Sequence, residues 1–228
     1  MGISAFKISA SDTTNHLFLT YVAKQQKPII LSTGLSTSEH VDNAVALLTK
    51  LKMRNKLILL QTTSDYPTPY EDVNLRVIPE YIKRYDLPVG LSDHTPDYLA
   101  SLGAVAMGAC VLEKHFTLNK KLSGPDQSSS LDPIELKNWI KNVRSMEIIL
   151  GSKNKFITNS EKQNLTMRKI LTIKPAKKGS TITSNLLNAK RGNIYGILPL
   201  EQNICKILGK KLKKEIKFET QLKWSMIE

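Results

Sequence analysis

Five short apolar runs alternate with segments of helical pattern in the first 150 residues of the chain. Each run is rich in branched apolar side chains and is bounded by glycine, proline, serine or charged residues, as is typical of buried strands. The runs are Ala5–Ile8, Pro28–Ser32, Leu57–Thr62, Pro88–Ser92 and Cys110–Phe116. Their alternation with helices predicts β-α-β units on a parallel sheet.

The segments between these runs carry helix signals. Apolar residues recur at helical spacing over His40–Leu48, and either Ser36 or Ser38 is the candidate N-cap. Thr95 followed by a proline predicts another helix start, because proline in the first turn sacrifices no hydrogen bond. The pattern over Glu135–Leu150 predicts the last helix of this part.

The spacing of the predicted strands indicates a barrel. Successive strands begin about 22 to 31 residues apart, close to the roughly 30 residues per unit of a (β/α)₈ barrel. Five strands cannot close a barrel that needs eight, and an open arc leaves two unpaired edges. We therefore expect residues 1–150 to form an N-terminally truncated TIM barrel of about five strands.

A second domain is predicted after this part. Residues 151–166 form a polar linker, in which Ser160–Gln163 has the pattern of a capping box that opens a short helix. Ile170–Ile173 and Ser180–Thr183 are short strand-like pieces around a turn at Lys177–Gly179. We predict a small β-rich domain over residues 167–228.

Charge supports the same division. The net charge of the chain is +13, and residues 151–228 hold +12 of it, with 17 Lys/Arg and five Asp/Glu. Nucleic-acid binding is one interpretation, but the lysines of Lys210–Lys214 have no interleaved aromatic residues and no recognition-helix motif. A solvated face, or a field that attracts anionic substrates, is the favoured interpretation.

Targeting signals and cysteine chemistry add little. No apolar run approaches the roughly 20 residues needed to cross a bilayer, and the N-terminus lacks the apolar stretch of a signal peptide. We expect a cytoplasmic protein. Cys110 and Cys205 lack ligand or redox spacing, so we interpret both as reduced packing residues.

Polar residues at the ends of the apolar runs are the candidates for chemistry, because active sites of parallel barrels gather at the carboxyl ends of the strands. His94 and His115 each follow such a run, 21 residues apart. They are candidate ligands of a divalent metal, which in catalytic sites keeps coordination positions open. The alternative is that His94 caps the next helix and His115 is a half-buried structural side chain. Lys7 and the strand-end serines are candidate phosphate ligands.

Several ordered motifs at these positions resemble the sialic acid (N-acetylneuraminate) synthase family. The motifs are Lys27–Gly34, Tyr66–Asp72, Gly90–Thr95, Leu112–Thr117 and Gly124–Asp126. The resemblance covers nearly the whole chain, because residues from about 167 onward look like the C-terminal SAF, or antifreeze-like, domain of that family. It implies barrel strands four to eight followed by a SAF domain.

The resemblance also implies a reaction. Members condense phosphoenolpyruvate with an open-chain N-acyl amino sugar, such as N-acetylmannosamine, and release phosphate and a nine-carbon 2-keto acid. They use a divalent metal, manganese or magnesium, as a Lewis acid. His94 and His115 match the metal ligands of the family. Lys7 and Ser92 match phosphoenolpyruvate-binding positions, and Ser64 stands where relatives have Asn or Ser.

Four further positions match family residues. Asp12 falls where relatives carry the Glu or Asp suited to proton transfer, so Asp12 and Lys7 are the predicted catalytic residues. Tyr66 and Asp126 match sugar-contacting positions. Arg191 resembles an arginine that the SAF domain of one subunit projects into the barrel of its partner, which implies a domain-swapped homodimer. Each of the last three positions also has a structural alternative. Tyr66 could pack at a strand end, Asp126 could belong to a turn, and Arg191 could be a solvated surface charge.

Two departures from the family pattern lead to further expectations. Ala10 stands where many relatives have a phosphate-binding serine. The chain begins at what corresponds to barrel strand four, so we expect a fragment with impaired activity, whose Met1 is an internal start.

Gly124–Asp126 favours an N-acetylneuraminate or legionaminate type over a pseudaminate synthase. The alternatives are a non-catalytic fragment that pairs with a separate N-terminal piece, and a basic module that binds polyanions.

Overall fold

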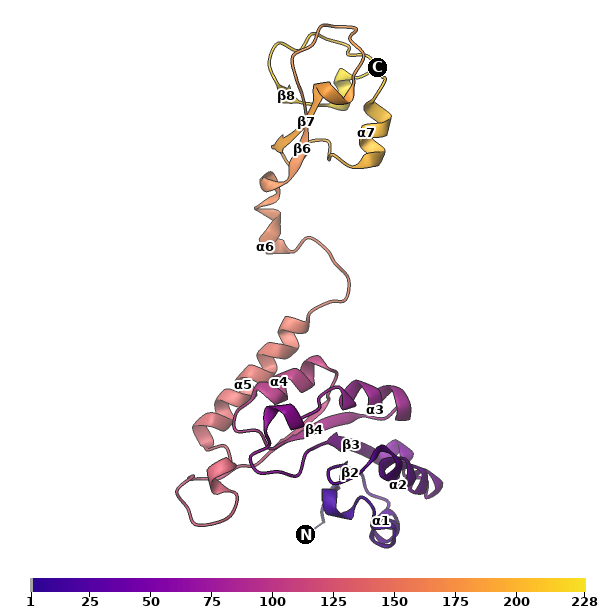
Figure 1. Cartoon of the computed structure of the whole chain (residues 1–228), viewed down its shortest axis with the longest axis vertical. Helices are drawn as coiled ribbons and strands as arrows, with labels where there is room; N and C mark the ends of the chain where they lie inside the picture. Colours follow the sequence, from indigo (N-terminus) through magenta and orange to yellow (C-terminus); the bar gives the residue numbers. More distant parts are fainter. Residues whose placement is uncertain (1) are drawn as a thin grey trace. The chain divides into compact units, whose positions relative to one another are not determined.

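The fold comprises two compact units, one ending at Gly151 and the other spanning Ser152–Glu228. The structure is a computed structural model that describes residues 2–228. The first unit contains a five-stranded parallel sheet, and the second contains a three-stranded antiparallel sheet (Figure 1).

The five predicted strands of the first unit are confirmed. They lie in the order of the chain and all neighbours pair in parallel: β1 (Phe6–Ile8), β2 (Ile29–Ser32), β3 (Leu57–Gln61), β4 (Val89–Asp93) and β5 (Val111–Lys114). Parallel neighbours need a crossover between them, and a helix supplies it in each case.

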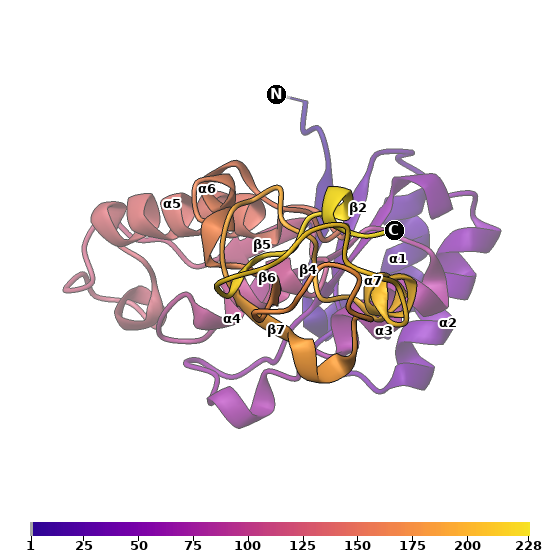
Figure 2. The ribbon, with the colours of Figure 1, turned by 90° about the horizontal axis from the view of Figure 1, so that it is seen from above.

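Five helices accompany the strands: α1 (His16–Ala23), α2 (Ser38–Lys50), α3 (Val77–Tyr85), α4 (Leu99–Ala106) and α5 (Pro133–Leu150). Helix α1 contacts α2, and α4 contacts α5, so the helices follow the strand order (Figures 1 and 2). Strand residues such as Leu31 and Leu59 pack with helix residues such as Leu19, Leu48 and Ile78 in one apolar core. Short 3₁₀ segments lie at Ala10–Asp12, Arg54–Lys56, Tyr70–Asp72 and Gln127–Ser129.

The sheet is curled. Lys7 on β1 and Glu113 on β5 lie on opposite edge strands, and four strand spacings of about 4.8 Å would separate these strands by roughly 19 Å in a flat sheet. Yet the Lys7 Nζ lies 3.4 Å from the Glu113 Oε1. The two edges therefore bend toward each other, as in half of a (β/α)₈ barrel.

Two helix starts differ from the prediction. The N-cap of α2 is Thr37, not Ser36 or Ser38, and its hydroxyl accepts from the His40 amide. Helix α4 begins at Leu99, not after Thr95. The reason is that the Thr95 amide and hydroxyl both donate to the Asp93 carboxylate, so this threonine closes the strand rather than capping the helix.

The second unit is built around β6 (Lys169–Ile173), which pairs antiparallel with β7 (Leu187–Arg191) and β8 (Thr220–Gln221). Helix α7 (Glu201–Ile207) completes a small core with residues such as Leu171, Ile182 and Leu222. The predicted strand at Ser180–Thr183 is wrong, because only an isolated bridge forms there, from Thr181 to Lys211. Further 3₁₀ segments lie at Leu165–Met167, Ser184–Leu186 and Trp224–Met226.

The linker helix and the cysteines also differ from expectation. Helix α6 (Asn159–Lys162) is opened by a capping box of Thr158 and Glu161, two residues before the predicted one. Cys110 and Cys205 carry free thiols but are exposed, so the prediction that both are packing residues is wrong. Among the described helices, none has the length and apolarity required to span a bilayer.

Candidate active site

A cavity of about 460 Å³ lies at the carboxyl ends of the parallel strands. Its lining includes residues from all five strands or from the segments that follow them. Six residues predicted from the sequence line it together: Lys7, Ser64, Tyr66, Ser92, His94 and His115. The curl of the sheet thus gathers side chains that lie up to 108 residues apart in the chain.

The two histidines lie side by side. The His94 and His115 ring centroids are 5.2 Å apart in an edge-to-face arrangement. They come together because Ser92 on β4 pairs in register with Glu113 on β5, and each histidine follows two residues later on the same face. The two imidazoles therefore face one volume rather than opposite sides of the sheet.

Hydrogen bonding fixes the tautomer of His94. Its Nδ1 lies 2.8 Å from the Thr63 carbonyl oxygen, which can only accept, so the proton resides on Nδ1. Burial is the largest influence on the pKa of the His94 imidazole, and it lowers that pKa. The ring is therefore neutral near pH 7, and its Nε2, 3.4 Å from the Ser92 hydroxyl oxygen, has a free lone pair toward the cavity.

Tyr66 covers both imidazoles. Its ring centroid is 4.2 Å from that of His94 and 5.4 Å from that of His115. Burial is the main cause that raises the pKa of the Tyr66 phenol, and the carboxylates of Asp126 and Glu113 raise it further. The phenol therefore stays protonated and can donate a hydrogen bond to a bound molecule.

Glu113 belongs to this constellation although it was not among the predicted site residues. It lines the cavity, accepts a 2.6 Å hydrogen bond from the Ser92 hydroxyl and approaches the Lys7 ammonium. The signal that could have found it is strand alternation, since Glu113 precedes His115 by two residues and so shares its face.

Ser32 is one of the strand-end serines considered as phosphate ligands, although no sequence pattern singles it out. It is 3% exposed, lines the cavity, and its Oγ has no hydrogen-bond partner within the described chain. A buried hydroxyl without a partner loses the hydrogen bonds that water would give it. This atom thus marks a position where a polar group of a ligand would be stabilised.

Three predicted residues do not line this cavity. Asp12 lies in the 3₁₀ segment after β1, where its carboxylate accepts a hydrogen bond from the side-chain amide of Asn15. Asp126 lies near the site, with its Oδ2 3.7 Å from the His115 Nδ1. Arg191 is exposed at the end of β7 in the second unit.

The donor set suits a metal ion with open positions. No group of three or more His, Cys, Asp or Glu side chains is arranged to hold a metal in the part of the chain described, residues 2–228. Two adjacent imidazoles, one of them neutral with an available Nε2, nevertheless fit a divalent ion that also takes water or substrate as ligands.

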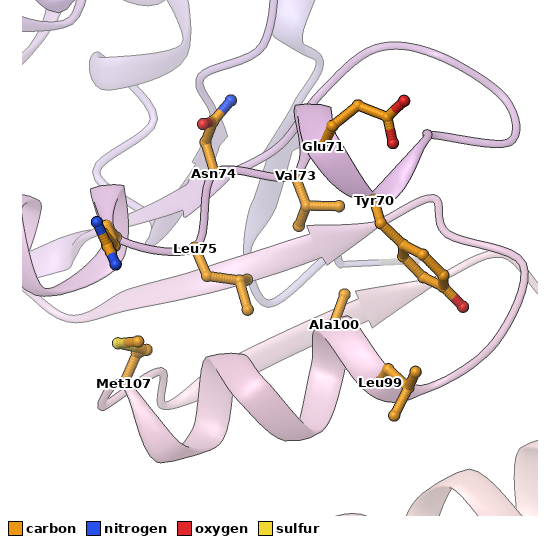
Figure 3. Close-up of a pocket in the computed structure, with 9 residues that line it drawn as sticks. Tyr70, Glu71, Val73, Asn74, Leu75, Leu99, Ala100 and Met107 are labelled. Carbon is orange, nitrogen blue, oxygen red and sulfur yellow. The ribbon is translucent and has the colours of Figure 1, made fainter.

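A larger cavity of about 600 Å³ lies elsewhere, between residues 70–76 and helix α4. Figure 3 shows Val73 and Leu75 directed toward the helix, from which Ala100 rises. Its lining is mainly apolar, with Glu71, Asn74 and Arg76 as the charged or amide side chains, and contains no histidine or lysine. The predicted site residues of the first unit that line a cavity therefore lie in the smaller one.

Comparison with known proteins shows a family match over the unit that contains the smaller cavity. The model of the NeuB family matches residues 1–155, which include every strand of the parallel sheet. The chain belongs to the NeuB family. It is 37% identical over 238 residues to the N,N'-diacetyllegionaminic acid synthase of Legionella pneumophila, and 35% identical over 216 residues to the human N-acetylneuraminate-9-phosphate synthase.

These matches cover 100% and 93% of this chain but only 65% and 59% of the respective relatives. A solved structure of an N-acetylneuraminic acid synthetase from Leptospira borgpetersenii, in complex with citrate, superimposes with a TM-score of 0.66 at 32% identity, over 72% of this chain and 57% of that one. NeuB family members thus carry the names of synthases, and the chain shares their barrel architecture over its parallel sheet.

Proposed function

We propose that the chain supplies the phosphoenolpyruvate- and metal-binding part of a synthase that condenses phosphoenolpyruvate with an N-acyl amino sugar, giving a nine-carbon 2-keto acid and phosphate. The observation that carries this proposal is the gathering of six expected site residues around one cavity. Membership of the NeuB family, whose named relatives make sialic, legionaminic or pseudaminic acids or their phosphates, supports the same reaction class.

The phosphate side of the substrate would bind at the ends of β1 to β4. Lys7 supplies a positive charge, and the hydroxyls of Ser32 and Ser64 supply neutral donors; the Ser92 hydroxyl, which donates to Glu113 in this structure, would turn from Glu113 to the ligand. Glu113 holds the Ser92 hydroxyl and pairs with the ammonium of Lys7, so it orients both groups. Ala10, which lines the same cavity, contributes no donor, and Ser9 and Ser11 on either side of it are the substitutes we propose.

The sugar side would lie at Tyr66, His94 and His115. A manganese or magnesium ion held by the two imidazoles would polarise the sugar aldehyde as a Lewis acid. Tyr66 presents a protonated phenol beside both rings and would donate to a sugar oxygen. Asp126 beside His115 is the proposed second sugar contact, and Asp12 is the proposed proton-transfer group.

The second unit has a proposed role as a SAF-type domain. Arg191 is exposed at the end of β7 and has the position in the chain expected of an arginine that reaches the site of a partner subunit in a homodimer. The excess of positive charge in residues 151–228 would also draw anionic substrates toward such a site. N-acetylmannosamine or a related N-acyl sugar is the proposed acceptor.

Metal binding gives a direct test of the proposed function. We expect the full 228-residue chain to bind Mn²⁺, and His94→Ala or His115→Ala to weaken that binding about 100-fold, since each removes half of the protein donors. Electron paramagnetic resonance of free Mn²⁺ measures the affinity. His16→Ala and His40→Ala, on helices α1 and α2, are matched controls that should bind like the unchanged chain. Equal affinity in all four variants would refute the metal role.

Ser32→Ala tests the phosphate subsite with little effect on the fold. Because the Ser32 hydroxyl has no partner within the described chain, its removal breaks no internal hydrogen bond, so the free energy of unfolding should stay within about 0.5 kcal/mol. Affinity for phosphoenolpyruvate, measured by calorimetry, should fall about fivefold or more, the loss of one hydrogen bond of about 1 kcal/mol. An unchanged affinity would place the phosphate elsewhere.

A further inference from the structure

A buried ion pair lies directly behind the two histidines. The side chains of Asp93 on β4 and Lys114 on β5 are 0% and 2% exposed, and the Lys114 Nζ is 3.1 Å from the Asp93 Oδ1. They are paired in register and each precedes one histidine by a single residue. Alternation along the strands therefore turns this pair toward the helices, while Ser92, His94, Glu113 and His115 face the cavity.

All the polar atoms of this pair are used. The Lys114 ammonium donates to the carbonyl oxygens of Thr95 and Asp97, each at 2.6 Å. The Asp93 carboxylate accepts from the Thr95 amide at 2.9 Å, from the Thr95 hydroxyl at 2.7 Å, and from the Ser101 hydroxyl. The network thus joins both strand ends to the segment that leads into α4.

The same network holds the backbone on both sides of His94. Asp93 and Thr95 are linked to each other and to Lys114, so the peptide that carries the imidazole cannot rotate without breaking several buried hydrogen bonds. Two further hydrogen bonds hold His94 itself. The backbone carbonyl of His94 accepts from the Thr68 amide at 2.9 Å, and the imidazole Nδ1–H of His94 donates to the Thr63 carbonyl oxygen. His115 is attached to the network through Lys114, its neighbour in the chain.

We propose that Asp93 and Lys114 are positioning residues, which hold the His94 ring against the Thr63 carbonyl that fixes its tautomer, set the spacing of His94 from His115, and so preorganise the metal site. This inference rests on the proposed function for the metal, but its structural part concerns the imidazoles themselves. A histidine ligand depends on the groups that fix its ring, and loss of such groups lowers metal affinity about 10- to 100-fold. A packing role alone would change stability without changing affinity.

The test uses a double variant that keeps the volume of the pair. Asp93→Asn combined with Lys114→Met removes both charges, so neither is left buried and unpaired, and the chain is expected to fold. We expect its Mn²⁺ affinity to fall about tenfold. Ser101→Ala, which removes a single hydrogen bond to Asp93, is the milder second variant, with an expected loss of about threefold.

Leu48→Ala is the matched control. Leu48 is fully buried in α2 and is not part of the network, so its removal leaves a cavity that lowers thermal stability while Mn²⁺ affinity stays unchanged. If the double variant and Ser101→Ala, both folded by circular dichroism, bind Mn²⁺ as the unchanged chain does, the positioning role is refuted. The same holds if Leu48→Ala loses as much affinity as they do.

Imidazole ¹⁵N resonances separate this inference from the proposed function. The chain has four histidines, so their ring signals can be assigned by single substitutions. Without metal, the unchanged chain should show the Nδ1–H tautomer of His94, and the double variant a mixture of tautomers. If the unchanged chain fails to bind Mn²⁺ but this shift occurs, the proposed metal role fails and the positioning role stands. If the tautomer is unchanged in the double variant, positioning is refuted whatever the metal does.

Discussion

The 228-residue polypeptide on its own should form no nine-carbon keto acid from phosphoenolpyruvate and an N-acyl amino sugar, even with Mn²⁺ present. Its parallel sheet has two edges, β1 and β5, and inner-face residues such as Ile30, Ile58 and Val111 remain only partly buried. Water therefore has access to a site whose charge stabilisation requires a dry, preorganised surround. Loss of even one preorganised donor costs about 100- to 1,000-fold in rate, so we expect turnover at least 1,000-fold below that of a full-length relative.

The measurement is phosphate release and keto-acid formation by the purified chain, then by the chain mixed with a separately expressed segment that carries the first three barrel strands of a relative. Activity that appears only on mixing would support completion of the barrel. Open strand edges also favour association, which sedimentation of the chain alone would detect. Turnover by the chain alone at the rate of a full-length relative would contradict the expectation.

Gly90→Ala should destabilise the first unit by about 3 kcal/mol. Gly90 lies in the middle of the sheet, paired with Leu60 on β3 and Val111 on β5. An added Cβ would lie 2.2 Å from the Val111 carbonyl oxygen and 2.6 Å from the Leu60 Cδ2. Because the first of these atoms is backbone in the sheet, it cannot move without separating β4 from β5.

Urea unfolding of the first unit can be followed by the fluorescence of Trp139 on α5, in a Trp224→Phe background. Gly103→Ala on α4 is the matched control, because its Cβ would meet only the flexible end of Leu75 and alanine favours the helix by about 1 kcal/mol. A Gly90→Ala variant that is as stable as Gly103→Ala would show that the strands can separate at little cost.

Periodicity predicted the parallel sheet because its signals are local. Each strand is a short apolar run that ends in polar residues, and the structure places these ends around one cavity. The two histidines could be paired before the structure was known, since position at successive strand ends is visible in the sequence. Glu113 was given no role and Ser32 was considered only as one of several strand-end serines, because neither is distinctive by residue type and only the facing direction of the strand assigns them to the cavity.

The errors came from side-chain hydrogen bonds and strand pairings that periodicity and capping patterns do not include. Thr95 has the local pattern of a helix start, but Asp93 and Lys114 occupy its polar groups and delay the helix to Leu99. In the second unit, Leu187–Arg191 forms β7 although its apolar–polar alternation covers only four residues and includes a single large apolar side chain, Leu187. Pairing with β6 decides that strand, and no single segment contains this information.

Strand alternation makes β4 and β5 intolerant of insertions of odd length. Facing direction along a strand has a period of two, so one extra residue before Ser92 would turn His94 toward the helices and Asp93 toward the cavity. His94 and Asp93 would exchange environments in a single step, which would leave the buried Lys114 without its carboxylate partner and the His94 imidazole out of reach of His115. Length variation among related sequences should therefore be confined to the connections outside the strands, such as residues 117–130 between β5 and α5, and the spacing from Ser92 to His94 should be inherited as a fixed unit.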